Sequence, residues 1–170
     1  MKIFAPRFCF RRVTDLTPAW LERQGLGALL LDVDNTLTTH NNPQVPPEVL
    51  AWLDRMKGAG VKLLLLSNNH PPRVAPFAQK LGLDFIADAA KPLGRGVARA
   101  RQKLGAFSGG IALVGDQIFT DVLCANLAGI PSILVEPMQL EDSWPFKLKR
   151  WAERLVAGKF LGQRGVDGDG

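Results

Sequence analysis

Cysteine and histidine are scarce in this sequence of 170 residues. Only Cys9 and Cys124 are present, they form no CxxC pair, and the two histidines do not cluster with them. A disulfide framework needs several cysteines and a thiolate metal site needs closely spaced ones, so the sequence predicts neither. We therefore expect a reducing compartment, and we expect Cys124 to be a small core residue.

Long apolar runs are also missing. The N-terminal segment 1–16 is basic, and Pro6, Arg7 and the arginine pair at 11–12 interrupt its apolar residues. This pattern is not typical of a signal peptide. No window approaches the roughly 18 apolar residues that a membrane-spanning helix needs. We therefore predict a cytoplasmic protein, with peripheral contact to the inner face of the membrane as an open alternative.

Acidic residues are outnumbered by basic ones. The chain has 21 Lys and Arg against 16 Asp and Glu, which gives a net charge of +5. This balance favours an anionic partner, such as a phosphorylated small molecule, an acidic lipid surface or a nucleic acid, but charge does not choose among them. The length and the hydrophobic content of 46% fit one domain that spans residues 1–170.

The chain does contain a regular alternation of apolar strands and helices. The predicted strands cover 28–33, 61–66, 83–86, 111–114 and 132–135. The predicted helices are a short one that Thr17 caps and Gly25 stops, then 45–58, 73–81, 94–104 and 120–128. Continuously apolar strands are typical of parallel strands that are covered on both faces. The predicted fold class is therefore α/β, with a doubly wound parallel sheet.

Two of the helices carry more specific predictions. Pro76 lies inside the segment 73–81 and lacks a backbone donor, so we expect a kink or a late start there. Thr120 precedes the last of these helices, and a threonine hydroxyl at that place can cap the first turn. We therefore expect Thr120 to be its N-cap.

Polar residues follow three of the predicted strands. Asp32 and Asp34 follow the first strand, Ser67 follows the second, and Asp116 and Asp121 follow the strand in IALVG. The carboxyl ends of parallel strands form the ligand crevice of an open sheet, so these side chains can converge there. Carboxylates that are packed together repel one another, and a divalent cation with oxygen ligands, such as Mg²⁺, relieves the repulsion.

Such a site fits the chemistry of phosphoryl transfer. One carboxylate can attack a phosphoryl group to form an aspartyl phosphate, while a second passes a proton to the leaving oxygen. The charged phosphoryl oxygens call for a cation, a hydroxyl and a lysine around them. Ser67 and Lys91 are placed to supply the hydroxyl and the lysine.

Four short motifs resemble those of haloacid dehalogenase (HAD) superfamily phosphatases. DVDNT at 32–36 matches the pattern DxDxT, Ser67 lies in LLLLSNN, Lys91 lies in AKP, and GDQIFTD at 115–121 is similar to the acidic fourth motif. Each motif follows the expected strand, and the four come in the family's order. The resemblance implies a Rossmann-like, three-layer fold with these motifs around one site.

The resemblance also implies roles for the residues on the substrate side of the site. Asp32 is the expected nucleophile and Asp34 the expected general acid and then base. Thr36 and Ser67 are expected to hold the phosphoryl group. Asn68 is a further candidate for phosphate binding, although asparagines in such loops often brace the backbone.

A Mg²⁺ site is implied as well. Its expected ligands are Asp32, Asp116 and the backbone carbonyl of Asp34. Lys91 is expected to neutralise charge on the phosphoryl group, and Asp121 to act through water or by orienting Lys91. His40 and His70 are expected to have structural or flap duties, because the carboxylates already fill the acid and base roles.

A longer stretch of the chain, about 4–155, is similar to the YqeG branch of HAD subfamily IIIA. Fungal mitochondrial relatives of this branch dephosphorylate phosphatidylglycerophosphate, so that lipid is the leading substrate. The intervals 37–66 and 68–90 are filled by core elements, which predicts no cap domain and an open crevice. A bulky substrate suits such a crevice, and the loop 38–47 is the only evident flap.

The C-terminal segment 143–160 combines aromatic and basic residues and is predicted to be an amphipathic helix. It can lie on an anionic membrane or dock its apolar face on the sheet, and both readings stay open. Residues 162–170 are expected to be a frayed tail. No recognised nucleic-acid module is present, so a nucleic-acid partner is not expected.

The sequence thus predicts a Mg²⁺-dependent phosphomonoester hydrolase with a phospho-Asp32 intermediate. Phosphatidylglycerophosphate is the leading substrate, and a soluble phosphorylated metabolite, a nucleotide or a phosphorylated polymer is the alternative. An alternative of another class is a non-catalytic adaptor that keeps the fold and binds an anionic partner through its basic face.

Overall fold

The structure is a computed structural model that describes residues 2–138. These residues belong to one compact unit. The predicted helix over 143–160 and the predicted tail over 162–170 lie outside the described residues. The prediction of a single domain over the whole chain therefore stays a prediction.

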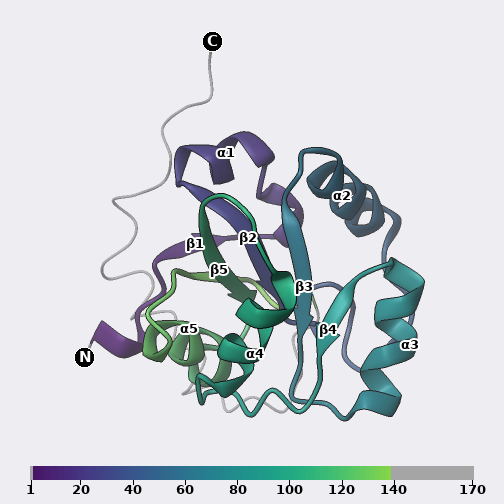
Figure 1. The fold of residues 1–170 in the computed structure, drawn as a ribbon. Coiled ribbons are helices and arrows are strands. Elements are labelled where there is room, and N and C mark those ends of the chain that lie inside the picture. The colour runs from purple at the N-terminus through teal and green to yellow at the C-terminus, as the bar shows by residue number, and fades with distance from the viewer. Residues whose placement is uncertain (1, 139–170) are drawn as a thin grey trace. The chain divides into compact units, whose positions relative to one another are not determined.

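Six parallel strands form one sheet in the order β1-β6-β5-β2-β3-β4 (Figure 1). The strands are β1 (Phe8–Phe10), β2 (Leu26–Leu31), β3 (Lys62–Leu66), β4 (Asp84–Ile86), β5 (Gly110–Gly115) and β6 (Ser132–Val135). From β2 the chain moves outward to β3 and β4 and then crosses back to β5 and β6, and β6 pairs with β1, the first strand in the sequence. This arrangement confirms the predicted doubly wound α/β sheet.

Helices cover both faces of the sheet. They are α1 (Pro18–Arg23), α2 (Pro47–Gly58), α3 (Pro71–Leu81), α4 (Arg95–Leu104) and α5 (Leu123–Leu127), with a π-helical turn, η3 (Ile118–Val122), directly before α5. Apolar residues of α1, α2 and α3 pack on one face, and those of α4 and α5 on the other. The described residues therefore form the predicted three layers.

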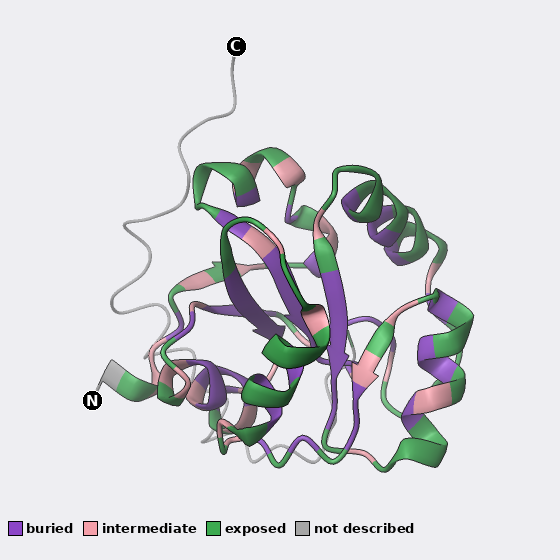
Figure 2. Cartoon of the chain, viewed as in Figure 1, coloured by how far each residue is buried: buried purple, intermediate pink, exposed green. Residues whose placement is uncertain are grey.

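The central strands are buried on both sides (Figure 2). In β2, Leu29 and Leu31 face the layer of α1 to α3, whereas Ala28 and Leu30 face α4 and α5. Successive side chains of a strand point to opposite faces, so a strand covered on both faces must be apolar at every position. This packing explains the uninterrupted run of leucines before Asp32.

Strand β1 is an element that the sequence did not reveal. It pairs in parallel with β6 at the edge of the sheet, from Phe8 opposite Ile133 to Phe10 opposite Val135. Only three residues long, it carries no apolar run of the kind that marks the inner strands. Phe8 and Phe10 both contact Trp20 edge to face at 4.9 Å between ring centroids, which ties this edge to α1.

Two predicted helix starts are wrong. Helix α3 begins at Pro71, so it starts before residue 73 and not late, and it contains Pro76. Pro71 occupies the first helical position, where its missing N–H has no helical partner to lose. Thr120 lies inside the turn η3, and its hydroxyl is 3.2 Å from Oε1 of Gln117, so it is not the N-cap. Thr17 does cap α1, since its hydroxyl accepts from the N–H of Trp20.

Candidate active site

The candidate residues lie at the carboxyl ends of the three central strands. Asp32 directly follows β2, Ser67 follows β3 and Asp116 follows β5, and these strands are neighbours in the sheet. The backbone N–H of Asp32 donates to the carbonyl of Val114 at 2.9 Å, so the hydrogen bonding between β2 and β5 continues as far as Asp32. The sheet therefore fixes the backbone from which the acidic side chains project.

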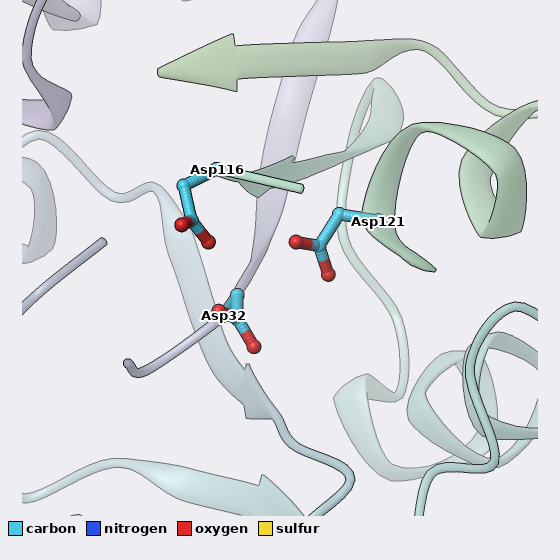
Figure 3. Close-up of side chains that lie close together, drawn as sticks. All are labelled: Asp32, Asp116 and Asp121. Atoms are coloured by element: carbon cyan, nitrogen blue, oxygen red, sulfur yellow. The ribbon is translucent and has the colours of Figure 1, made fainter. Parts of the chain in front are cut away.

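Three carboxylates converge at this edge. Oxygen atoms of Asp32, Asp116 and Asp121 all lie within 4.8 Å of one another. Figure 3 shows the three side chains directed toward one another, with Asp32 and Asp116 projecting from strand ends and Asp121 from the helical turn beside them. Asp32 and Asp121 are buried. Negative groups so close together and so far from water require positive charge between them.

Lys91 supplies part of that charge. Its Nζ donates to Oδ1 of Asp32 and to Oδ1 of Asp121, at 2.6 Å in each case, and its side chain is only 3% exposed. Burial lowers the pKa of Lys91, but the charges of Asp32 and Asp121 outweigh that effect and raise it above its ordinary value. Lys91 is therefore an ammonium ion shared by two buried carboxylates.

Asn68 holds the main chain of Lys91. Its Nδ2 donates to the carbonyl of Lys91 at 3.1 Å, and its Oδ1 accepts from the N–H of Lys91 at 2.7 Å. Both ends of the amide are used in this way, so the contacts of Asn68 are those of a loop brace. Its predicted contact with phosphate stays a prediction.

One lysine does not balance three carboxylates. Burial and the charge of Asp121 raise the pKa of Asp32 to about 7. Burial and the charges of Asp32 and Asp121 raise the pKa of Asp116 to about 8. The folded chain thus retains protons on carboxyl groups at a pH where free carboxyls have lost them. A divalent cation would replace those protons and leave the carboxylates ionised.

The donor atoms fit such a cation. Oδ1 of Asp116 is buried and has no hydrogen-bond partner among the described residues. A buried carboxylate oxygen without a partner is costly, and a metal ion satisfies it. The surrounding ligands are oxygen atoms, which suit Mg²⁺ and not the softer metals that prefer thiolate or imidazole. Asp32, Asp116 and Asp121 are the residues that could hold it.

Thr36 and Ser67 carry the two hydroxyl groups that the sequence predicted for this site. Thr36 is buried, and its Oγ1 also lacks a hydrogen-bond partner among the described residues. Ser67 is buried and accepts the N–H of Asn69 at 3.1 Å, which leaves its own hydroxyl hydrogen available as a donor. Both groups can donate to an anion.

Asp34 stands apart from the buried cluster. Its Oδ2 accepts from Nδ2 of Asn69 at 2.9 Å, and its Oδ1 accepts from Arg73 at 3.0 Å and from the N–H of Asn41 at 3.2 Å. Nδ1 of His40 is 3.9 Å from the same Oδ1. Arg73 also donates to Oδ1 of Asn41. The carboxylate is thus held by the loop after β2, by the loop after β3 and by the first turn of α3.

Sequence reasoning missed Arg73 and Gly115. Arg73 could have been suspected, because the first turn of the helix after Ser67 begins near the carboxyl end of β3. Gly115 ends β5, and a Cβ there would lie closer than 3.0 Å to Cβ and Cγ of Asp121. Only glycine leaves room for Asp121 beside the strand, and the glycine before the acidic pair in GDQ was the available signal.

Three further polar or sulfur-containing residues lie outside the acidic cluster. His70 pairs with Asp88 at 2.6 Å between Nδ1 and Oδ1, and both side chains are largely exposed. Cys124 is buried in the apolar layer of α4 and α5, as predicted. Asn35 is buried in a left-handed conformation, with φ of 60°, and its carbonyl accepts from Met138.

Comparison with known proteins identifies the family. Residues 15–129 match the haloacid dehalogenase-like hydrolase family. The chain is also 33% identical, over 155 residues, to "Probable phosphatase YqeG" of Bacillus subtilis, and the alignment covers 91% of this chain and 90% of that protein. The chain therefore belongs to the haloacid dehalogenase-like hydrolases, and the predicted phosphatase class is confirmed. The non-catalytic adaptor has no support from these relatives.

A more distant relative and a solved structure are also similar to this chain. Phosphatidylglycerophosphate phosphatase 1 of Arabidopsis thaliana is 23% identical over 79% of this chain, which spans 44% of that protein. A crystal structure of a protein from Listeria monocytogenes serotype 4b aligns with a TM-score of 0.56 at 19% identity, covering 71% of this chain and 85% of that chain. The second likeness supports the fold alone.

Proposed function

We propose that the chain is a Mg²⁺-dependent phosphomonoester hydrolase that forms a phospho-enzyme on Asp32. The observation that carries this proposal is the buried contact of Lys91 with Asp32 and Asp121, beside the unsatisfied oxygen of Asp116. A structural core has no need to gather three carboxylates, two of them buried, beside one ammonium ion, since an unbalanced buried charge is destabilising. A site for a phosphoryl group and a cation explains them.

In this proposal Asp32, Asp116 and the backbone carbonyl of Asp34 would hold Mg²⁺, which would supply positive charge to the phosphoryl oxygens. Lys91, which contacts Asp32, adds a second positive charge. Thr36 and Ser67 donate their hydroxyl hydrogens to phosphoryl oxygens. Asp121 keeps the ammonium of Lys91 in place.

The first chemical step transfers the phosphoryl group to the protein. A carboxylate oxygen of Asp32 attacks phosphorus, and the bond from phosphorus to the alcohol oxygen breaks. Asp34 donates a proton to that oxygen, so the alcohol leaves neutral. Asn69 and Arg73 hold the carboxyl group of Asp34 for this transfer.

The second step releases phosphate. Asp34, now ionised, takes a proton from a water molecule, and the water oxygen attacks phosphorus. The bond between phosphorus and Asp32 breaks, which gives inorganic phosphate, restores the carboxylate of Asp32 and leaves Asp34 protonated, as it was before the first step. The same residue serves as acid and then as base because the first step leaves it in the form that the second step needs.

Phosphatidylglycerophosphate is the proposed substrate. The named activity of the Arabidopsis relative supports it, as does the open crevice that we predict from the absence of a cap. A soluble substrate is the second candidate, because "Phosphoglycolate phosphatase" of Caulobacter vibrioides is 34% identical over 52% of this chain and 41% of that protein. No helix among the described residues is long and apolar enough to cross a bilayer. Contact with a membrane through residues 143–160 stays part of the proposal.

The test is phosphate release in the presence of Mg²⁺, with wild type and Asp32→Asn compared on phosphatidylglycerophosphate micelles and on soluble phosphomonoesters. Loss of the nucleophile is expected to lower turnover by more than about a thousandfold. Release from the lipid alone supports the lipid substrate, and release from soluble esters alone replaces it. An Asp32→Asn protein that keeps most of its turnover would contradict the mechanism.

A further inference from the structure

We propose that Arg73 forms a subsite for a second anionic group, carried by the alcohol part of the substrate. The inference rests on the proposed function, because it takes Asp34 as the acid that protonates the leaving oxygen. It adds a chemical class: the preferred substrates are phosphomonoesters whose leaving alcohol bears a phosphodiester or a carboxylate of its own.

The position of Arg73 follows from that of Asp34. A general acid must lie within hydrogen-bond reach of the atom that it protonates, so the leaving oxygen binds next to the carboxyl group of Asp34. The guanidinium of Arg73 is 3.0 Å from Oδ1 of this carboxyl group. Whatever is bonded to the leaving oxygen therefore lies beside Arg73 and not beside Lys91, whose ammonium is enclosed by Asp32 and Asp121.

Arg73 has more N–H donors than recorded acceptors among the described residues. A guanidinium carries five N–H groups in a planar fork, and among the described residues the recorded acceptors are only Oδ1 of Asp34 and Oδ1 of Asn41. The side chain is 45% exposed, whereas that of Lys91 is 3% exposed. A half-exposed guanidinium can donate two parallel hydrogen bonds to a phosphodiester or a carboxylate.

Asp34 does not depend on Arg73 alone. Asn69 donates to its Oδ2 at 2.9 Å, and the N–H of Asn41 donates to its Oδ1 at 3.2 Å. These two contacts keep the carboxyl group oriented when Arg73 turns toward an anion. The arrangement differs from that of a purely structural ion pair, in which the carboxylate would lose its orientation along with its partner.

The test compares two substrates that share the phosphoryl group and the glycerol next to it. One is glycerol phosphate, whose alcohol is neutral, and the other is the deacylated, water-soluble headgroup of phosphatidylglycerophosphate, whose alcohol carries a phosphodiester. Wild type is expected to prefer the second substrate. Arg73→Gln is expected to raise the KM for the charged substrate by about tenfold to a hundredfold and to reduce that preference to near unity.

Two further variants sharpen the result. Arg73→Lys keeps the charge but not the planar fork, so it is expected to retain part of the preference. Arg101→Gln removes an exposed arginine of α4, which packs on the other face of the sheet from α3, and is expected to leave both substrates unaffected. Thermal melting of each variant checks that it is folded.

The inference is overturned if Arg73→Gln lowers turnover of both substrates by the same factor with KM unchanged, because Arg73 then only positions Asp34. It is also overturned if wild type shows no preference for the charged substrate. If wild type hydrolyses no phosphomonoester at all while it binds Mg²⁺, the proposed function itself fails, and the subsite fails with it.

Discussion

The buried acidic centre and the ring of contacts around Asp34 are built in opposite ways. In the centre, Lys91 and Asp121 are almost fully buried and meet at 2.6 Å, and their contact is shared with Asp32. Around Asp34, the partners come from two loops and a helix turn, and Arg73 is half exposed. Rigid buried charge suits a reaction centre, whereas half-exposed donors suit recognition of the variable part of a substrate.

Removal of Lys91 is expected to give the largest change. Lys91→Met leaves Asp32 and Asp121 buried without their ammonium partner, which costs about 3–5 kcal/mol of unfolding free energy and abolishes turnover. Arg73→Gln removes a half-exposed charge and is expected to cost less than about 1 kcal/mol. Urea unfolding of the two variants without metal measures both. Equal losses would erase the distinction between the two regions.

Substitution of Gly115 tests how closely the centre is packed. Gly115→Ala places a methyl group against Asp121, which must move away from Lys91. Overpacking of this kind lowers the free energy of unfolding by about 1–3 kcal/mol. We also expect turnover to fall more than tenfold, since a rise of about 1.4 kcal/mol in the activation free energy already slows a reaction tenfold. Thermal melting and initial rates check this, with Gly58→Ala as control, because a Cβ at Gly58 meets nothing within 4 Å. Full activity of Gly115→Ala would mean that Asp121 is dispensable.

Magnesium and pH are expected to act on the centre together. The raised pKa values of Asp32, about 7, and Asp116, about 8, mean that the folded chain holds protons that the unfolded chain has released above about pH 4. Stability without metal therefore falls as the pH rises from about 4 to 8. Mg²⁺ competes with these protons, so its stabilising effect grows over the same interval.

Calorimetric melting with EDTA or with millimolar Mg²⁺, at about pH 6 and about pH 8, measures this effect. The shift in Tm is expected to be a few degrees and larger at the higher pH. A shift that is equal at both pH values, or absent, would show that Asp32 and Asp116 do not take up the ion.

The smallest change in stability and kinetics is expected among the contacts around Asp34. Asn41→Gly removes the side-chain acceptor of Arg73 while it keeps the N–H that Asp34 uses, and glycine tolerates the left-handed backbone at this position, where φ is 57°. We expect stability to change by less than about 0.5 kcal/mol and KM by about threefold or less. Steady-state kinetics measure the change, and a large loss of turnover would place Asn41 in the reaction centre.

Much of the fold could be read from the sequence because the inner strands are apolar at every position. The leucines before Asp32 and before Ser67 mark strands buried on both faces, and the rule for parallel sheets then brings their carboxyl ends together. The short edge strand at Phe8 carries no such pattern. Helix α3 begins at Pro71 because proline suits a first turn, although Pro76 indicated a later start.

The candidate site, too, could be predicted only in part from the sequence. Residues attached to strand ends, such as Asp32 and Asp116, have backbone positions that the topology fixes, so their convergence could be foreseen. Arg73 reaches Asp34 through a long side chain, and periodicity does not tell where such a side chain points. The contact of Asp121 with Gly115 depends on the π-helical turn, which no propensity in IFTDV indicates.

The double hydrogen bond of Asn68 to the main chain of Lys91 has a dynamic consequence. It joins the end of β3 to the loop that leads into α4, so the segments that carry Ser67 and Lys91 move as one rigid piece. Opening of either segment therefore displaces the hydroxyl of Ser67 and the ammonium of Lys91 in a single event. Amide hydrogen exchange would then report one common opening rate for Lys91 and Ser67.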